Sequence, residues 1–357
     1  SADSLVMNQG VVIKHRIFTL GIFALCSLGA LEMSGARGDG IESPGVGPGH
    51  DPSAIQGANQ CVECHKHSGS IWESTPHFAT ITEMPRSDEG RAIAKRMGIK
   101  RIKSESLCLD CHATTKMVAE KTKPVSGISC ESCHGAARGW LKRHGEFSGK
   151  EEGQESATEI AARWNDAQVA GMLRPAMILE IARNCVSCHV IPNEALINTG
   201  LHSTGSDFEL VAWTQGVIRH NNFYTKGKEN KVASLERQRM LHIVGILAEM
   251  ETVLRAVATA TSGGDYAVKN AKRFARLRKR LDAVDKLADI TQVSEAMAAI
   301  KNLKMSLKNQ PAIASAADQI TSAVNAFAAI HDGSQLQSID SLLAKPENYR
   351  GGSPESP

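Results

Sequence analysis

The sequence predicts a mainly α-helical protein, in which a cysteine- and histidine-rich region with little regular structure precedes a C-terminal antiparallel helical bundle. Three observations favour this fold class: four copies of a short cysteine motif, a low aromatic content of 4%, and four amphipathic stripes after residue 232. Hydrophobic residues make up 42% and charged residues 22% of the 357 residues, as in a folded globular chain. The formal net charge of +3 is too small to indicate nucleic-acid binding.

The N-terminal segment is typical of a secretion signal. Lys14, His15 and Arg16 precede an apolar run over 17–31, and small residues follow up to Ala36. We expect a signal peptide over 1–36 that is cleaved after Ala36. An uncleaved N-terminal membrane anchor is the alternative, although the run is shorter than the ~20 apolar residues that a membrane span needs.

The rest of the chain divides by composition and periodicity. Residues 37–56 are rich in Gly and Pro and predict a flexible linker. Apolar residues at a spacing of three or four indicate helices in the C-terminal part, and short connections between them favour an antiparallel bundle. The stripes cover 232–257, 267–284, 293–307 and 313–330. The predicted domains are 57–228 for the cysteine- and histidine-rich region, 229–344 for the bundle and 345–357 for a disordered tail.

Eight of the nine cysteines lie in four CxxCH pentapeptides. This pattern attaches c-type haem, since two thiols on one helical turn form thioethers with one porphyrin and the histidine binds its iron. Zinc explains CxxC pairs but not a histidine after every pair. We therefore predict four covalently attached c-type haems, which also supply the large flat core that the few aromatic residues do not. The motif residues are Cys61, Cys64 and His65; Cys108, Cys111 and His112; Cys130, Cys133 and His134; and Cys185, Cys188 and His189.

A second axial ligand for each iron must come from the other histidines. Four of them lie inside the haem region and are the candidates: His77, His144, His202 and His220. For the remaining histidines other roles are favoured, because they lie in the signal, in the linker, next to a motif, beside an apolar stripe or at a helix end: His15, His50, His67, His242 and His331. Sequence spacing does not assign a candidate to a haem.

The order of these features resembles the tetrahaem cytochrome c-554 family of ammonia-oxidising bacteria, and more loosely the cytochromes related to hydroxylamine oxidoreductase and pentahaem nitrite reductase. The resemblance covers about 57–228. It rests on CVECHKHSGSIWESTPHF with Trp72 and His77, on CLDCH, on GISCESCHG followed by His144, and on CVSCH followed by His220.

The resemblance implies that His77, His144 and His220 are second ligands, and that the haem of His112 has none. His202 is an additional histidine that departs from the family pattern, and it could supply the second axial ligand to the iron of that haem. The helical segment from 232 has no counterpart in the short family members.

Iron with two histidine ligands has no open position, so it carries electrons and does not bind substrate. The favoured function is therefore an electron carrier that uses closely packed bis-histidine haems. The alternative is an enzyme that acts on nitric oxide, nitrite or hydroxylamine at a five-coordinate haem of His112.

The expected partners are redox proteins, and the sequence defines neither the donor nor the acceptor. Basic residues over 269–280 would dock an acidic partner or a membrane surface, with a solvated helix face as the alternative. The bundle could also form a homo-oligomer. Since haem is attached to CxxCH outside the cytoplasm, the signal peptide and the motifs together predict a periplasmic protein.

Overall fold

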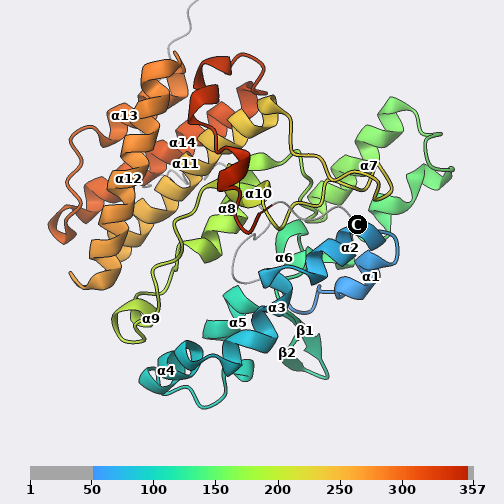
Figure 1. Ribbon diagram of the computed structural model, residues 1–357, viewed down its shortest axis with the longest axis horizontal. Helices are drawn as coiled ribbons and strands as arrows, with labels where there is room; N and C mark the ends of the chain where they lie inside the picture. The colour runs from blue at the N-terminus through green and yellow to red at the C-terminus, as the bar shows by residue number, and fades with distance from the viewer. Residues whose placement is uncertain (1–50, 353–357) are drawn as a thin grey trace, which may run out of the picture. The chain divides into compact units, whose positions relative to one another are not determined.

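The computed structural model describes residues 51–352, which are mainly helical (Figure 1). The predicted fold class is confirmed, since short helices precede packed C-terminal helices. The predicted signal peptide over 1–36 and most of the predicted linker lie outside the described residues. Within residues 51–352, no helix has both the length and the apolar character that a membrane span requires.

Within residues 51–234, ten short helices precede the bundle. Local signals begin several of them: Ser87 and Ser156 accept backbone N–H groups as N-caps, and Pro76 occupies the first turn of its helix. The helices are α1 (Ala58–Val62), α2 (Lys66–Glu73), α3 (Pro76–Glu83), α4 (Asp88–Arg96), α5 (Ser106–His112), α6 (Cys130–His134), α7 (Ala157–Val169), α8 (Ile178–His189), α9 (Glu194–Asn198) and α10 (Leu210–Thr214). Single turns of 3₁₀ helix connect some of them, among them η4 (Arg143–Gly145).

A two-stranded antiparallel hairpin follows α5, and the sequence analysis missed it. Strand β1 (Thr114–Val118) pairs with β2 (Lys121–Ser126), and the register shifts between Thr114 and Thr115. The turn between the strands is made by Ala119 and Glu120 at φ of 47° and 61°. Hairpin turns with two positive φ angles usually contain Asn or Gly, so this turn carries no recognisable sequence signal.

The four C-terminal helices are α11 (Leu235–Thr259), α12 (Asp265–Leu287), α13 (Thr291–Ile300) and α14 (Gln310–Ile330). They agree with the four predicted stripes except at the end of the third, where the helix ends at Ile300 and not near 307. Leu303 and Leu307 are still partly buried against the core, so apolar periodicity continues after the helix has stopped. Pro311 lies in the first turn of α14, where a missing N–H costs nothing.

The bundle and the preceding helices share one hydrophobic core. Helix α11 is buried on nearly all sides, and α8 packs against it through Leu179, Ala182 and Val186. A helix that is apolar all round is stable only inside a core. The predicted units 57–228 and 229–344 are therefore not separate packing units within the described residues, because α8 belongs to both.

Two segments that were expected to be flexible or disordered are packed where the structure describes them. In the predicted linker 37–56, Ile55 is fully buried, and Ala54 accepts the backbone N–H of Arg138. In the predicted disordered tail 345–357, Tyr349 is 6% exposed, and the backbone of Arg350 pairs with α10 and the loop after it. Both expectations are wrong for residues 51–56 and 345–352, because tertiary hydrogen bonds offset the entropy cost that composition alone suggested.

The ion pair between Arg239 and Asp340 ties the C-terminal segment to α11, and it predicts a pH dependence. Guanidinium hydrogen bonds at 2.6 and 2.8 Å lower the pKa of Asp340. The stabilisation is therefore complete above the unfolded-state pKa of about 3.9 and is lost as pH falls through the lower folded-state pKa. We expect D340N to lower the melting temperature at about pH 6, and the gap to the wild type to close toward about pH 2.

Thermal unfolding followed by circular dichroism at several pH values measures this effect. The exposed Asp289, which makes no hydrogen bond or ion pair in the described residues, provides the control variant D289N. A gap between D340N and the wild type that does not change with pH would contradict the assignment.

Candidate functional site

The four CxxCH motifs all lie at helix ends. In α5, α6 and α8 the motif closes the helix, and its histidine is the last helical residue. In the first motif α1 ends at Val62, and His65 is the N-cap of α2. A helical turn places both thiols of a motif on one side, and the histidine follows directly on the same turn.

Gly135 ends α6 and allows a close backbone approach behind the third motif. Its φ is +88°, and a Cβ atom there would lie 2.1 Å from the carbonyl oxygen of Gly171. This approach lets Leu173 donate its N–H to the carbonyl of His134 at 2.8 Å. The backbone around the third motif thus depends on position 135, which only glycine can occupy without strain.

Four pairs of imidazole rings face each other at nearly one distance. Each pair joins the histidine of one motif to one candidate second ligand: His65 with His144 at 6.3 Å between ring centroids, His134 with His220 at 6.1 Å, His189 with His77 at 6.2 Å, and His112 with His202 at 6.3 Å. Two imidazoles bonded at about 2 Å to opposite sides of one metal ion have centroids about 6 Å apart. The spacing therefore fits one metal ion between the rings of each pair.

Hydrogen bonds fix the ring orientation of most of these histidines. Nδ1 of His134, His144, His202 and His220 donates to a backbone carbonyl, at distances of 2.6 to 2.9 Å. Nδ1 of His189 lies 3.3 Å from the hydroxyl of Ser206. When Nδ1 carries the proton, Nε2 keeps its lone pair for a metal ion, and the hydrogen bond makes it a better ligand.

The candidate second ligands come from short elements that other parts of the chain hold in place. His77 lies in the first turn of α3, and its carbonyl accepts the N–H of Ile128. His144 lies in η4, where its carbonyl accepts a hydrogen bond of 2.6 Å from Arg163. Arg163 in turn forms a buried ion pair with Glu155, whose side chains are 5% and 2% exposed.

His202 and His220 lie in loops. His220 follows α10, and the carbonyl of the preceding Arg219 accepts a hydrogen bond of 2.7 Å from Asn230. His202 lies after α9, where its N–H donates to Leu196. Neither loop has a sequence signal that predicts its partner motif.

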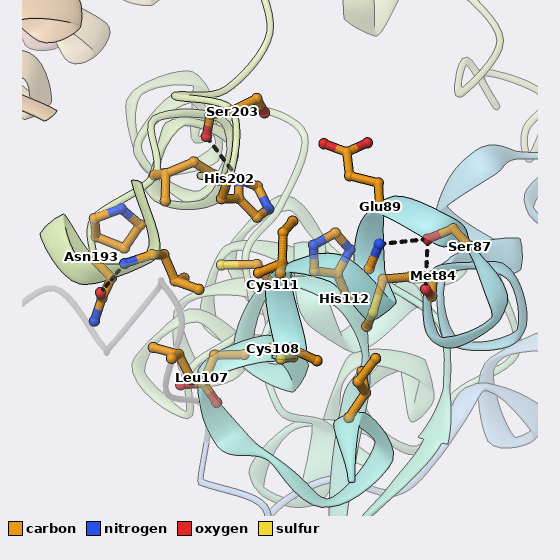
Figure 2. A pocket seen from close by; sticks show the side chains of 18 residues that line it. Met84, Ser87, Glu89, Leu107, Cys108, Cys111, His112, Asn193, His202 and Ser203 are labelled. Atoms are coloured by element: carbon orange, nitrogen blue, oxygen red, sulfur yellow. Dashed lines mark hydrogen bonds between the residues drawn. The ribbon is translucent and has the colours of Figure 1, made fainter. Parts of the chain in front are cut away.

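A pocket lies around His112 and His202 (Figure 2). Its volume is about 500 Å³, which lies in the range of cofactor pockets. Cys108, Cys111 and His112 come from α5, His202 comes from the opposite loop, and apolar side chains of α4 and α9 complete the lining.

The other described histidines do not join these pairs. His242 is 5% exposed and lies 3.3 Å from the carboxylate of Glu209. His331 stacks on Phe327 and contacts Gln292. His67 is exposed beside Gly227. His15 and His50 lie outside the described residues.

The motifs are neighbours in space in a definite order. The thiols of Cys61 and Cys130 interact, as do those of Cys111 and Cys188. Cys133 lies close enough to Cys185 to influence it electrostatically. The four motifs thus form a series in which the first lies beside the third, the third beside the fourth, and the fourth beside the second.

Burial keeps the motif histidines in the form that binds metal. Desolvation lowers the pKa of His134 to about 4, and the pKa of His189 is likewise about 4 through desolvation and the charges of His77 and Arg273. Desolvation also lowers the pKa of His65 and His112. A metal ion requires the neutral imidazole, which these residues therefore hold at neutral pH.

Two observations test whether a haem fits these sites. Each pair places two imidazoles and the two cysteines of a CxxCH motif in one site, the donor set that an iron porphyrin attached through thioethers requires. Trp140 is 4% exposed, lies edge-on to His144 at 5.2 Å, and its indole N–H has no acceptor. A buried donor without a partner is rare, and a haem propionate has the chemistry to accept it.

Sequence reasoning missed the residue that joins the first and third motifs. Glu131, inside the third motif, is completely buried. Its carboxylate accepts the backbone N–H groups of Gln56, Gly57 and Ala137 at 2.8, 2.6 and 2.9 Å. Nothing in the local sequence distinguishes Glu131 from the exposed Glu63 of the first motif, because the difference arises from tertiary contacts.

Helical CxxCH motifs faced by further histidines are the arrangement expected of a multihaem c-type cytochrome domain. Residues 60–135, which include the first three motifs, match the family model of cytochrome c554 and c-prime. The resemblance to the cytochrome c-554 family is thereby confirmed over these residues, and c-type haem is the cofactor that it implies.

Among curated proteins, cytochrome c-554 of Nitrosomonas europaea is 28% identical over 98 residues, which are 25% of this chain and 42% of that protein. The chain thus matches less than half the length of this relative. A comparison with solved structures gave no significant match.

Removing the Glu131 carboxylate is expected to destabilise the protein. In E131A, three backbone donors lose their acceptor, which costs roughly 3 kcal/mol of unfolding free energy. Guanidinium unfolding followed at the haem absorption band measures the loss. The variant E63A, in the exposed glutamate of the first motif, is the control and should change stability by less than about 0.5 kcal/mol. Equal effects of the two variants would contradict the role of Glu131.

Proposed function

We propose that this protein is a periplasmic tetrahaem c-type cytochrome that passes electrons between redox partner proteins. The observation that carries the proposal is the common spacing of the four histidine pairs, with centroids 6.1 to 6.3 Å apart. Each pair would hold one haem iron, and the pairs are His65 with His144, His134 with His220, His189 with His77, and His112 with His202. The eight motif cysteines would bind the four porphyrins covalently.

Bis-histidine coordination supports electron transfer and disfavours catalysis. When bound, haem supplies an iron that is oxidised and reduced by one electron. The chain would contribute two imidazoles to each iron, whose orientation the Nδ1 hydrogen bonds fix. Rigid ligands that keep their positions in both oxidation states are what a carrier needs.

The order of the four motifs in space supports a continuous route for electrons through the protein. Thiols of neighbouring motifs interact at the junction of the first with the third motif and at that of the fourth with the second. The two ends of the series are therefore the motifs of His65 and His112. We propose that the unidentified donor and acceptor exchange electrons with these two ends.

The basic face of α12 supports partner docking only weakly. Five of the seven basic side chains over 269–280 contact other groups of the chain, which leaves Lys272 and Lys279 without a hydrogen bond or ion pair in the described residues. A solvated helix face is the simpler interpretation of these charges.

An enzyme acting on a small nitrogen species would need an open iron, and His112 is the candidate. The approach of His202 to 6.3 Å favours a closed iron instead. Electron paramagnetic resonance of the oxidised protein separates the two functions. We expect low-spin signals only; a high-spin signal from about one haem in four would favour the enzyme.

Histidine variants test the individual ligand assignments. We expect H202A and H144A each to convert one of the four haems from low spin to high spin, because each removes one axial ligand. The variant H67A is the control and should leave all haems low spin, since His67 faces none of the motif histidines. If H202A and H144A keep the wild-type spectrum, the proposed pairs are wrong.

A further inference from the structure

One short loop contacts two of the four histidine pairs. Residues 202–206 begin with His202, which faces His112, and end with Ser206, whose hydroxyl lies 3.3 Å from Nδ1 of His189. Between them Gly205 has a φ of +96°, and a Cβ atom there would lie 2.0 Å from the carbonyl oxygen of His189. The position of this loop therefore bears on the coordination of two haems.

The loop has little regular structure of its own. Residues 201–209 contain no helix or strand, and Leu201 adopts a φ of 55° while its side chain is 60% exposed. Two local hydrogen bonds hold His202. Its backbone N–H donates to the carbonyl of Leu196, and its ring Nδ1 donates to the carbonyl of Ser203. Such a segment requires contacts from outside to keep one conformation.

The bundle supplies these contacts through one buried arginine. Arg273 on α12 is 4% exposed and donates to the carbonyls of Thr204, at 3.0 Å, and Ser206. Its Nε donates to Glu249 on α11, which is 3% exposed. One planar guanidinium thus joins two bundle helices to the loop that carries His202.

A second set of contacts holds the other end of the same connection. Glu194 of α9 accepts the backbone N–H groups of Thr261 and Ser262, which precede α12. Asn198 accepts the N–H of Tyr266 at 2.9 Å. The chain between the fourth motif and His202 is therefore fastened to the start of α12 and to the connection that precedes it.

A purely structural ion pair does not explain this arrangement. Buried ion pairs are often replaceable by apolar residues without loss of stability, because desolvation offsets the attraction. The pair of Arg273 and Glu249 does something apolar residues cannot, since two carbonyl oxygens of the loop need donors. Lysine cannot reproduce the fork geometry that reaches both carbonyls.

We propose that Arg273, held by Glu249, is a positioning residue that keeps loop 202–206 in place, so that His202 closes the iron of His112 and Ser206 orients His189. The helical bundle is then the support for axial ligation at the second and fourth haems. This inference rests on the proposed bis-histidine coordination. It assigns a role in the haem region to the C-terminal helices.

The test uses the haem-loaded full chain with the substitution R273M. We expect the oxidised protein to show one of four haems converted to high spin, and the reduced protein to bind one carbon monoxide per chain where the wild type binds none. The matched control is R239M, which breaks the other buried arginine pair of α11 without contacting the loop. This control should lower thermal stability and leave all haems low spin.

Two further variants make the outcome decisive. If R273M does not fold, R273K should bind carbon monoxide, which the wild type does not, because a single ammonium cannot hold both carbonyls. The variant H202A separates the two proposals: if H202A gives a high-spin haem while R273M and R273K behave as the wild type, the role of Arg273 is wrong and the ligand pairs stand. If R239M opens a haem as readily as R273M, the effect is general destabilisation and the inference fails.

Discussion

The fixed separation between the two imidazoles of each histidine pair is the constraint on which the rest of the structure depends. A metal–nitrogen bond allows little variation, so a centroid distance near 6 Å must be reproduced at every site. The four observed distances differ by only 0.2 Å between the smallest and the largest, 6.1 and 6.3 Å. Short helices and loops can meet this demand only where other contacts fix their backbones, as Arg163 does for His144 and Asn230 does for the loop of His220.

The same constraint explains what the sequence could predict. A CxxCH motif is complete within five residues, so its thiols and its histidine are recognisable without any tertiary information. The set of candidate second ligands could be found by elimination among the histidines, and the bundle by its periodicity. The pairing could not be found, because none of the candidates faces the motif nearest to it in sequence. His77, for example, follows the first motif and faces His189 of the fourth.

Residues 51–56 and 345–352 are more ordered than their composition suggests, and both segments are held by hydrogen bonds to distant parts of the chain. Residues 51–56 contain one proline and no glycine, and their composition gave no reason to expect that Glu131 would accept the backbone N–H groups of Gln56 and of Gly57, which follows directly. The tail at 345–352 is likewise held by backbone bonds to α10 rather than by any periodic pattern. Order that depends on a single distant acceptor leaves no trace in local composition.

The residues that face His112 and hold that partner in place come from outside the part of the chain that matches the family. The family match ends at 135, whereas His202, its loop and the helices that hold the loop all follow later. The resemblance alone implied an open second haem, and the position of His202 opposes that implication for this chain. A loop without regular structure could not hold a ligand at a fixed distance by itself, so the added histidine and the added bundle are best understood together. The buried Arg273 is the contact through which the bundle reaches the loop.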